Sequence, residues 1–445
     1  MKLSLLDILE ATGGGEVGGT QVGNTYTTFH TDSREVKPGG VFFALRGSEM
    51  DGHRFVSDAI SRGATCVVVS RRMDIPTGIA EVTVQDTWAA LYALAAYVLE
   101  RVRPLVVGVT GSNGKTSTKE MVAVILARHF KVRRTMGNRN TETGLPLTLL
   151  GLEPDDTALV LEMGLQQPGD IGKLAALAKP SVGIITNIGV VHIEFFKSRE
   201  ELARAKGELV AALPEDGLAV LNADNEFFPL LARMTSARIA TFGDDNGDYR
   251  VWGYRLLPHG GSQFSIKGVL VKLAMEGRHQ AVNAAAALAA CEFAGVPISV
   301  GAAALADIKV EHRLQEIRTP GGFSVIDDAY NASPESMLAA FDTLHESSHP
   351  GRLLAVLGEM RELGALAEEA HRQVGQKAKE TFAAVCVVES PLGRILAESA
   401  GAEVVPERAA AVEWVRRNAR PGDRVLVKAS RGVHLDEVVR ELTAS

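Results

Sequence analysis

The sequence predicts an α/β fold divided among three domains, and three observations predict it. The chain has 445 residues, which exceeds what one ordinary hydrophobic core supports and suggests about three domains. Apolar, β-branched runs alternate with helical segments from residue 105 onward, which is typical of βαβ units around a parallel sheet. The alternation begins again near residue 312. We therefore expect domains at residues 1–84, 85–311 and 312–445.

The first domain mixes glycine-rich turns with short strands, as a small α/β domain does. Residues 40–45 and 65–69 are its clearest strands, because they are apolar and rich in β-branched or aromatic residues. A helix is expected over residues 86–103, and Pro104 closes it.

The other two domains carry the strand and helix alternation. Three strands of the second domain each precede a helix: 106–109 before one from Lys115, 158–162 before one near 171–178, and 182–186 before one from Arg199. An antiparallel hairpin is expected over 249–273, before a helix that begins near Arg278. The third domain has strands at 323–326, 353–357, 384–388 and 424–427.

Composition narrows the class of protein. The net charge of −7 argues against a general nucleic-acid binder, since such binding needs many Lys and Arg contacts with phosphates. The three cysteines stand far apart in apolar contexts, which disfavours a disulfide framework or a zinc site. There is neither a signal-peptide pattern nor an apolar run long enough to span a membrane. We expect a monomer in the cytoplasm.

The most informative stretch leads from an apolar strand into a glycine-rich turn and a helix. Gly111 and Gly114 allow successive backbone N–H groups to point at an anion, Lys115 adds positive charge, and the Thr116 hydroxyl suits Mg²⁺. A regular phosphate-binding loop would have glycine at Val109, so this is a shortened relative. We expect it to bind a nucleoside triphosphate. The alternative is an ordinary strand-to-helix turn with a surface lysine.

Polar residues follow two further strands, where ligands of α/β sheets bind. Glu162 ends an apolar strand and is placed as an acidic Mg²⁺ ligand would be. His192 follows the next strand and is a candidate metal ligand or phosphate contact. The alternatives are a solvated glutamate and a structural histidine.

Lys206 occupies an unusual position on its helix. A capping box at residues 198–201 starts that helix, and Lys206 shares an apolar stripe with Leu202, Leu209 and Leu213. Burying an unpaired ammonium costs several kcal/mol, so we expect Lys206 to be paired, neutral or chemically modified. The alternative is a lysine that extends to solvent from the edge of the stripe.

The third domain contributes a strand that ends in two carboxylates, Asp327 and Asp328. Ser333 then caps a helix with Pro334 in its first turn. The paired acids are candidates for holding a substrate ammonium, and acids exposed to solvent are the alternative.

Together these motifs resemble, in order, those of the Mur ligases, the ATP-dependent amino-acid ligases of peptidoglycan synthesis. The matching pieces cover nearly the whole chain: 31–34, 38–39, 51–53, 110–116, 137–140, 144–146, 162–164, 186–188, His192, Glu194, Lys206, 222–224, His279, Asn283, 311–315 and 428–431. Residues 327–337 and 358–364 are similar to the signatures of members that use D-alanyl-D-alanine. The resemblance implies a UDP-binding first domain, a central P-loop ATPase domain and a Rossmann-like C-terminal domain.

The resemblance also implies an activity. ATP would phosphorylate the terminal carboxylate of UDP-N-acetylmuramoyl-tripeptide, and the amine of D-alanyl-D-alanine would attack the acyl phosphate. Alternatives within the enzyme class are the addition of lysine or diaminopimelate to UDP-N-acetylmuramoyl-dipeptide, and folylpolyglutamate ligation. An ATP-gated binding protein is the alternative from another class.

Site residues follow from the same resemblance. Catalytic roles fall to Lys115, Glu162, His192 and Lys206. ATP would contact Gly111, Ser112, Asn113, Gly114, Lys115, Thr116, Ser117, Asn283, Arg313 and Asp327. The other substrates would contact Ser33, Arg34, Asn138, Asn140, Thr141, Asp328, Tyr330, Asn331, Lys428, Ser430 and Arg431. Two Mg²⁺ ions would be held by Thr116, Glu162, His192 and Lys206, the last as a carbamate formed with CO₂.

Overall fold

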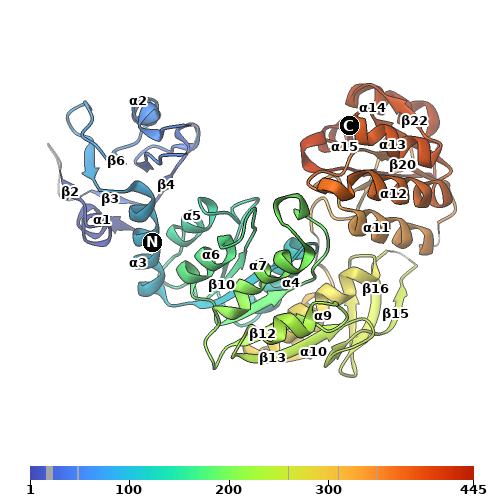
Figure 1. The fold of residues 1–445 in the computed structure, drawn as a ribbon, viewed down its shortest axis with the longest axis horizontal. Helices are drawn as coiled ribbons and strands as arrows, with labels where there is room; N and C mark the ends of the chain where they lie inside the picture. The colour runs from blue at the N-terminus through green and yellow to red at the C-terminus, as the bar shows by residue number, and fades with distance from the viewer. Residues whose placement is uncertain (17–23, 48–49, 259, 309, 348, 445) are drawn as a thin grey trace. The chain divides into compact units, whose positions relative to one another are not determined.

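The computed structural model describes residues 1–16, 24–47, 50–258, 260–308, 310–347 and 349–444 (Figure 1). These residues form two compact units. Unit 1 comprises Met1–Gly108, Phe130–Leu165 and Gly169–Ser181, and unit 2 comprises Val109–His129, Gln166–Pro168 and Val182–Ser445. Each unit is built from sheets with parallel strands, and the predicted α/β class is confirmed.

Unit 1 begins with a five-stranded sheet in the order β2-β7-β6-β5-β4, parallel except for β2. Its strands are β2 (Gly15–Glu16), β4 (Phe29–His30), β5 (Val41–Phe43), β6 (Cys66–Val69) and β7 (Ala80–Thr83). The strands β1 (Leu3–Ser4) and β3 (Thr25–Tyr26) form a separate pair. The helices are α1 (Leu5–Thr12), α2 (Val56–Ser61) and α3 (Thr87–Val102). The helix predicted over 86–103 is α3, and the Asp86 side chain caps it.

The rest of unit 1 contains the strand that carries Glu162 and the elements beside that strand. The strand β10 (Ala158–Glu162) lies between β9 (Val132–Arg134), to which it is parallel, and the start of β8 (Leu105–Thr110). All five residues of β10 are buried, as their continuous apolar run predicts. The helices here are α5 (Gly144–Leu150) and α6 (Asp170–Ala178).

Unit 2 continues from the end of β8 with parallel strands in the order β14-β13-β12-β11-β8. The strands are β11 (Val182–Ile185), β12 (Leu218–Asn222), β13 (Arg238–Gly243) and β14 (Tyr249–Arg250). The helices are α4 (Lys115–Leu126), α7 (Arg199–Ala211), α8 (Phe228–Ala232), α9 (Arg278–Phe293) and α10 (Ile298–Ala304). Ala203 and Val210 of α7 share one apolar cluster with alternate residues of β12, so α7 covers one face of this sheet.

The predicted hairpin over 249–273 is wrong in two respects. Tyr249 and Arg250 form β14, which pairs in parallel with β13. The remaining residues form three antiparallel strands, β15 (Trp252–Leu256), β16 (Ser262–Ile266) and β17 (Val269–Leu273). The physical reason is a second turn, at Lys267 and Gly268, where both residues have positive φ and reverse the chain again.

The C-terminal domain of unit 2 is a six-stranded sheet in the order β18-β19-β23-β20-β21-β22. Its strands are β18 (Gln315–Arg318), β19 (Ser324–Asp327), β20 (Leu353–Leu357), β21 (Ala384–Val388), β22 (Glu403–Val405) and β23 (Arg424–Lys428). Only β18 is antiparallel to its neighbour. The strand β18 was not predicted, because its residues Gln-Glu-Ile-Arg lack an apolar run.

Helices cover both faces of this sheet. The helices α11 (Pro334–Glu346), α12 (Ala367–Thr381) and α13 (Pro391–Ala400) pack on one face, and α14 (Arg408–Asn418) and α15 (Asp436–Thr443) pack on the other. The helix after β23 therefore lies on the opposite face from the helices after its neighbours β19 and β20. This topological switch point lies at the carboxyl end of β23, the kind of place where ligands of α/β sheets bind.

In the described part of the chain, no helix is both long enough and apolar enough to cross a membrane.

Substitution of Phe341 tests the packing of the C-terminal domain. Its ring is fully buried on α11 and meets the Phe382 ring edge-on, with centroids 5.0 Å apart. We expect Phe341→Ala to lower the free energy of unfolding by about 3–5 kcal/mol in urea titrations, because it removes buried area and leaves a cavity. Leu366→Ala, at a residue 43% exposed, is the control with little effect. Equal losses in both variants would contradict the packing described.

Candidate active site

The phosphate-binding loop owes its shape to two glycines. Gly111 and Gly114 have φ values of 146° and 81°. A Cβ on Gly111 would collide with the Thr186 hydroxyl, and one on Gly114 would lie 2.5 Å from the side-chain oxygen of Asn283. Both positions therefore require glycine for steric as well as conformational reasons.

Side chains at the end of β11 hold this loop. Thr186 Oγ1 donates to the Asn113 carbonyl at 2.6 Å, and the Asn113 N–H donates to Asn187 Oδ1 at 2.9 Å. Lys115 folds back over the loop, with Nζ 2.9 Å from the Gly111 carbonyl. Thr186 and Asn187 were not predicted as site residues. Their polar side chains directly after an apolar strand are a signal that could have identified them as such.

Lys206 is 1% exposed and reaches the loop from α7, where its Nζ donates to the Gly111 carbonyl at 3.2 Å. Leu202 and Leu209 are fully buried beside it, so the predicted apolar stripe is confirmed. Burial, followed by repulsion from Lys115, lowers the pKa of Lys206 well below its ordinary value. No carboxylate among the described residues forms an ion pair with it, which favours a neutral or modified amine over a paired one.

In unit 1, Glu162 is 3% exposed at the end of β10, so a solvated strand-end glutamate is the wrong description. Asn140 Nδ2 donates to Glu162 Oε1 at 3.0 Å, and the Glu162 N–H donates to Thr135 Oγ1 at 3.1 Å. Asn138 is half-buried and Thr141 is exposed on the same connection between β9 and α5. These contacts orient the carboxylate of Glu162, which is a candidate metal ligand.

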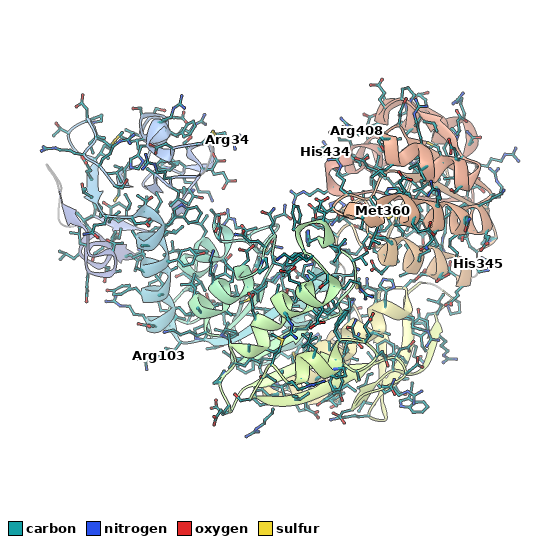
Figure 2. The ribbon with its side chains drawn as sticks, viewed as in Figure 1. Arg34, Arg103, His345, Met360, Arg408 and His434 are labelled. Carbon is teal, nitrogen blue, oxygen red and sulfur yellow. The ribbon has the colours of Figure 1, made fainter. Side chains whose placement is uncertain are left out.

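The two other predicted substrate residues of unit 1 lie in the turn after β4. Ser33 is buried. Arg34 is exposed (Figure 2), and its guanidinium pairs with Asp32 at 2.6 Å.

His192 lies in the connection after β11 and has a φ of 67°, which L-residues rarely adopt. Its Nδ1 forms an ion pair with the Glu362 carboxylate. The hydrogen bond from His192 is the main cause that lowers the pKa of Glu362. Glu362 was not predicted as a site residue. No pattern in the neighbouring sequence indicates that it pairs with His192, which is distant in the chain.

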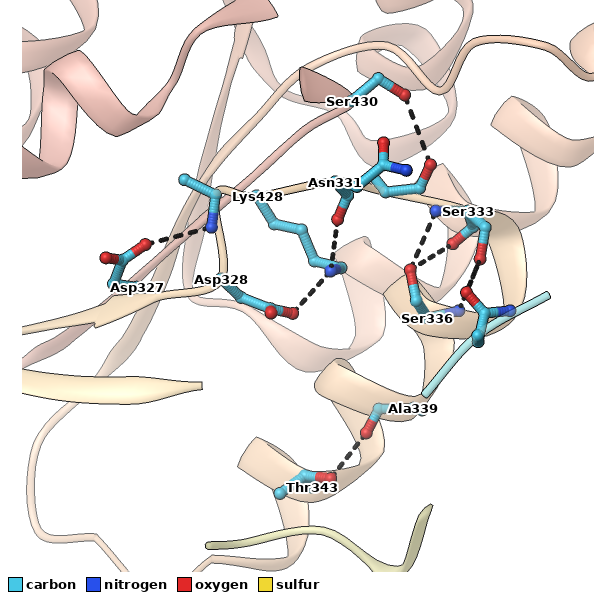
Figure 3. Close-up of polar contacts among 12 residues, drawn as sticks. Asp327, Asp328, Asn331, Ser333, Ser336, Ala339, Thr343, Lys428 and Ser430 are labelled. Carbon is cyan, nitrogen blue, oxygen red and sulfur yellow. Dashed lines mark hydrogen bonds and ion pairs between the residues drawn. The ribbon is translucent and has the colours of Figure 1, made fainter. Parts of the chain in front are cut away.

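At the carboxyl ends of β19 and β23, a buried ion pair lies at this switch point (Figure 3). Lys428 is 1% exposed, and its Nζ lies 2.6 Å from Asp328 Oδ2 and donates to the Asn331 carbonyl at 3.0 Å. Burial lowers the pKa of Lys428, and the neighbouring Asp328 opposes this effect. The ammonium held by Asp328 in this structure is therefore the chain's own. Asp327 contacts His312 Nδ1 at 2.6 Å.

The start of α11 connects this switch point to the phosphate-binding loop. Ser333 caps α11, as predicted, and its Oγ donates to the Asn113 side-chain oxygen at 3.0 Å. Ser430 Oγ donates to the Ala332 carbonyl at 3.3 Å, and the Arg431 N–H donates to Asn331 Oδ1 at 3.4 Å.

Arg313 brings a further positive charge to the loop. Its guanidinium lies 3.5 Å from Thr116 Oγ1 and 4.6 Å from the centroid of the Tyr330 ring, near which Arg431 also lies. His312 and Leu314, on either side of Arg313, both have positive φ. Cations therefore surround the loop at more than one point, which suits a site that gathers several negative charges.

Two predicted ATP contacts lie on helices beside the loop. Asn283 of α9 is 6% exposed, and its Nδ2 donates to Gln280 Oε1 at 3.2 Å. Ser117 is buried in the first turn of α4.

Unit 2 thus holds most of the predicted site: Gly111, Ser112, Asn113, Gly114, Lys115, Thr116, Ser117, His192, Lys206, Asn283, Arg313, Asp327, Asp328, Tyr330, Asn331, Lys428, Ser430 and Arg431. Unit 1 holds Ser33, Arg34, Asn138, Asn140, Thr141 and Glu162. A phosphate cradle, several cations and a polar cluster at the switch point within unit 2 suit phosphoryl transfer followed by attack of an amine.

Three descriptions of one protein family match consecutive parts of the chain. "Mur ligase family, catalytic domain" matches residues 25–112, "Mur ligase middle domain" matches 109–291, and "Mur ligase, glutamate ligase domain" matches 312–431. The chain belongs to the Mur ligase family, and the resemblance inferred from its motifs is confirmed.

Within that family, similar proteins share one name, UDP-N-acetylmuramoyl-tripeptide--D-alanyl-D-alanine ligase. The one from Bacillus subtilis (strain 168) is 37% identical over 427 residues, which cover 93% of each chain. The one from Escherichia coli (strain K12) is 35% identical and covers 98% of this chain and 97% of its own. The crystal structure of MurF ligase from Thermotoga maritima in complex with ADP has a TM-score of 0.82 at 30% identity, covering 94% of this chain and 97% of that one. The predicted class of enzyme, a ligase, is confirmed.

The loop that carries Glu359 and Glu362 gives a pH-dependent prediction. His371 is fully buried, its Nδ1 contacts the Ala367 carbonyl at 2.6 Å, and its Nε2 accepts the Met360 N–H at 2.8 Å (Met360 is labelled in Figure 2). Burial lowers the pKa of His371 below its ordinary 6.5, so the unfolded chain takes up this proton first. We expect the stability from neutral His371 to be complete above pH 6.5 and to decrease as the pH falls toward the lowered pKa.

The measurement is urea unfolding of the wild type and His371→Gln between pH 8 and 5. The wild type should exceed His371→Gln in free energy of unfolding by the largest amount at high pH, and this difference should shrink below pH 6.5. A difference that stays constant with pH would show that His371 does not titrate as described.

Proposed function

We propose that this chain joins D-alanyl-D-alanine to the terminal carboxylate of UDP-N-acetylmuramoyl-tripeptide at the expense of ATP. The γ-phosphoryl group moves to the carboxylate and ADP leaves. The amine then attacks the acyl carbon, a C–N bond forms, phosphate leaves and the amine loses a proton. The products are UDP-N-acetylmuramoyl-pentapeptide, ADP and phosphate. A single observation carries the proposal: Ser333, at the start of α11 in the C-terminal domain, is hydrogen-bonded to Asn113 of the phosphate-binding loop.

The cations reduce the repulsion between the carboxylate and the γ-phosphate, which is the main electrostatic barrier to this reaction. Lys115 would neutralise the β- and γ-phosphates. Arg313, beside Thr116, would stabilise the charge that develops on the transferred group. Asn283, beside Gly114, would contact the adenine.

The residues present fit Mg²⁺, which prefers oxygen ligands and keeps several waters or phosphate oxygens. The Thr116 hydroxyl and the Glu162 carboxylate are of this kind, and His192 is a candidate for a second metal position. When bound, Mg²⁺ would neutralise phosphate charge. Because burial lowers its pKa, Lys206 is disposed to be the neutral amine that adds CO₂ and loses a proton to give a carbamate. That product would replace a buried cation with an oxygen-bearing anion.

The substrates would divide between the domains. Ser33, Arg34, Asn138, Asn140 and Thr141 would hold the nucleotide sugar peptide. Asp328, Tyr330, Asn331, Lys428, Ser430 and Arg431 would hold the dipeptide. A monomer in the cytoplasm stays a prediction from the sequence.

The first test is phosphate release from ATP and Mg²⁺ with UDP-N-acetylmuramoyl-tripeptide, with and without D-alanyl-D-alanine, with the product mass checked. We expect release that requires both substrates and yields the pentapeptide mass. Release with UDP-N-acetylmuramoyl-dipeptide and a diamino acid instead would favour the neighbouring ligase. ATP binding without phosphate release under either condition would favour an ATP-gated binding protein.

The second test addresses Lys206. Lys206→Ala should lower kcat by about 100-fold or more, because an anion at the site is lost. A short carboxylic acid added to the assay should restore part of the activity to this variant alone. Lys173→Ala, at an exposed lysine of α6, is the control and should behave as the wild type. Full activity of Lys206→Ala would rule out the carbamate.

A further inference from the structure

One short loop is contacted by two carboxylates of the C-terminal domain. This docking loop, Gly189–Glu194, follows β11. Its Val190 N–H donates to Glu335 Oε1 at 2.9 Å, and its His192 forms the ion pair with Glu362. Glu335 lies in the first turn of α11, and Glu362 lies in the connection after β20.

The same loop is also bonded to the phosphate-binding loop. The Gly189 N–H donates to Ser112 Oγ at 2.9 Å. The docking loop therefore touches the phosphate-binding loop at its first residue and the C-terminal domain at its next residues.

The contact is close at the backbone as well as at the side chains. A Cβ on Gly189 would lie 2.6 Å from Glu335 Oε1, and a Cβ on Gly364 would lie 3.2 Å from Glu194 Cα. The Glu194 N–H also points to the Glu362 carbonyl, at 3.4 Å.

Both partners of the ion pair adopt costly backbone conformations. His192 has a φ of 67° and Glu362 one of 64°, although neither is glycine. Such conformations persist where the surroundings impose them and are concentrated at functional sites. Here they direct the two side chains at each other across the contact.

We propose that Glu335 and Glu362 form a clamp by which the C-terminal domain docks on the docking loop and sets the orientation of the His192 ring. Since Glu362 occupies Nδ1, the ring presents Nε2 as its remaining nitrogen, which is the arrangement of a histidine prepared to bind a metal or a phosphate. Glu362 is thus a positioning residue. This inference rests on the proposed function for its consequence in catalysis, but docking itself can be measured without substrates.

The first experiment measures docking by the distance between two spin labels, on Asp216→Cys and Glu398→Cys. Both sites are exposed, and the native cysteines Cys66, Cys291 and Cys386 are buried. We expect Glu362→Ala and Gly189→Ala each to broaden the distance distribution of the labelled protein. Gly189→Ala keeps both carboxylates and acts by steric exclusion alone. The matched control is Glu368→Ala on α12, where the carboxylate pairs with Arg372 at the surface.

A double-mutant comparison shows whether the pair acts as a unit. The distribution of His192→Ala/Glu362→Ala should be no broader than that of either single variant, and Glu362→Gln, which keeps an acceptor for Nδ1, should recover part of the wild-type distribution. An unchanged distribution in Glu362→Ala, or a double variant whose effect is the sum of the two, would overturn the clamp.

The kinetic consequence separates this inference from the proposed function. Glu362→Ala should raise KM for the dipeptide by roughly 10-fold, the loss expected for one charge-assisted hydrogen bond. If the wild type forms no pentapeptide, the proposed function fails whatever the spin labels report. If the wild type is active and Glu362→Ala has unchanged KM and distances, the clamp fails alone.

Discussion

The structure depends on one crowded backbone position, the carbonyl of Gly111. It accepts hydrogen bonds from both Lys115 and Lys206, while the Gly111 Cα leaves no room for a side chain beside Thr186. Two amines on one carbonyl repel each other when both are charged, which contributes to the lowered pKa of Lys206. The strand β8, the helix α7 and the end of β11 therefore have to meet within a few ångströms, and the anion-binding geometry of the loop follows from that meeting.

A second constraint is topological. Because β23 is inserted between β19 and β20 and is followed by a helix on the opposite face, the sheet of the C-terminal domain has its switch point at the carboxyl end of this strand. The polar residues Asp328 and Lys428 form an ion pair there. The position of the switch point is a consequence of strand order, and its chemistry is a consequence of which residues end the strands.

Features that depend on local periodicity were predictable from the sequence. The burial of Lys206 follows from the spacing of leucines on α7, and the cap at Ser333 follows from a serine before a proline. Contacts between distant segments were not predictable in this way. Val190 and Glu335 are 145 residues apart, and no local pattern marks either residue as the partner of the other. The polar edge strand β18 was not predictable for a different reason. Its place in the sheet is set by its pairing with β19.

The strained connection around Arg313 has a thermodynamic consequence for docking. His312 and Leu314 hold positive φ values, at roughly 1–2 kcal/mol each, in the short segment between α10 and β18. A short tether keeps the C-terminal domain at a high effective concentration beside the phosphate-binding loop. Few direct bonds are then sufficient for association, since little translational freedom remains to be lost. The same domain supplied as a separate chain would need a far larger interface to reach equal occupancy.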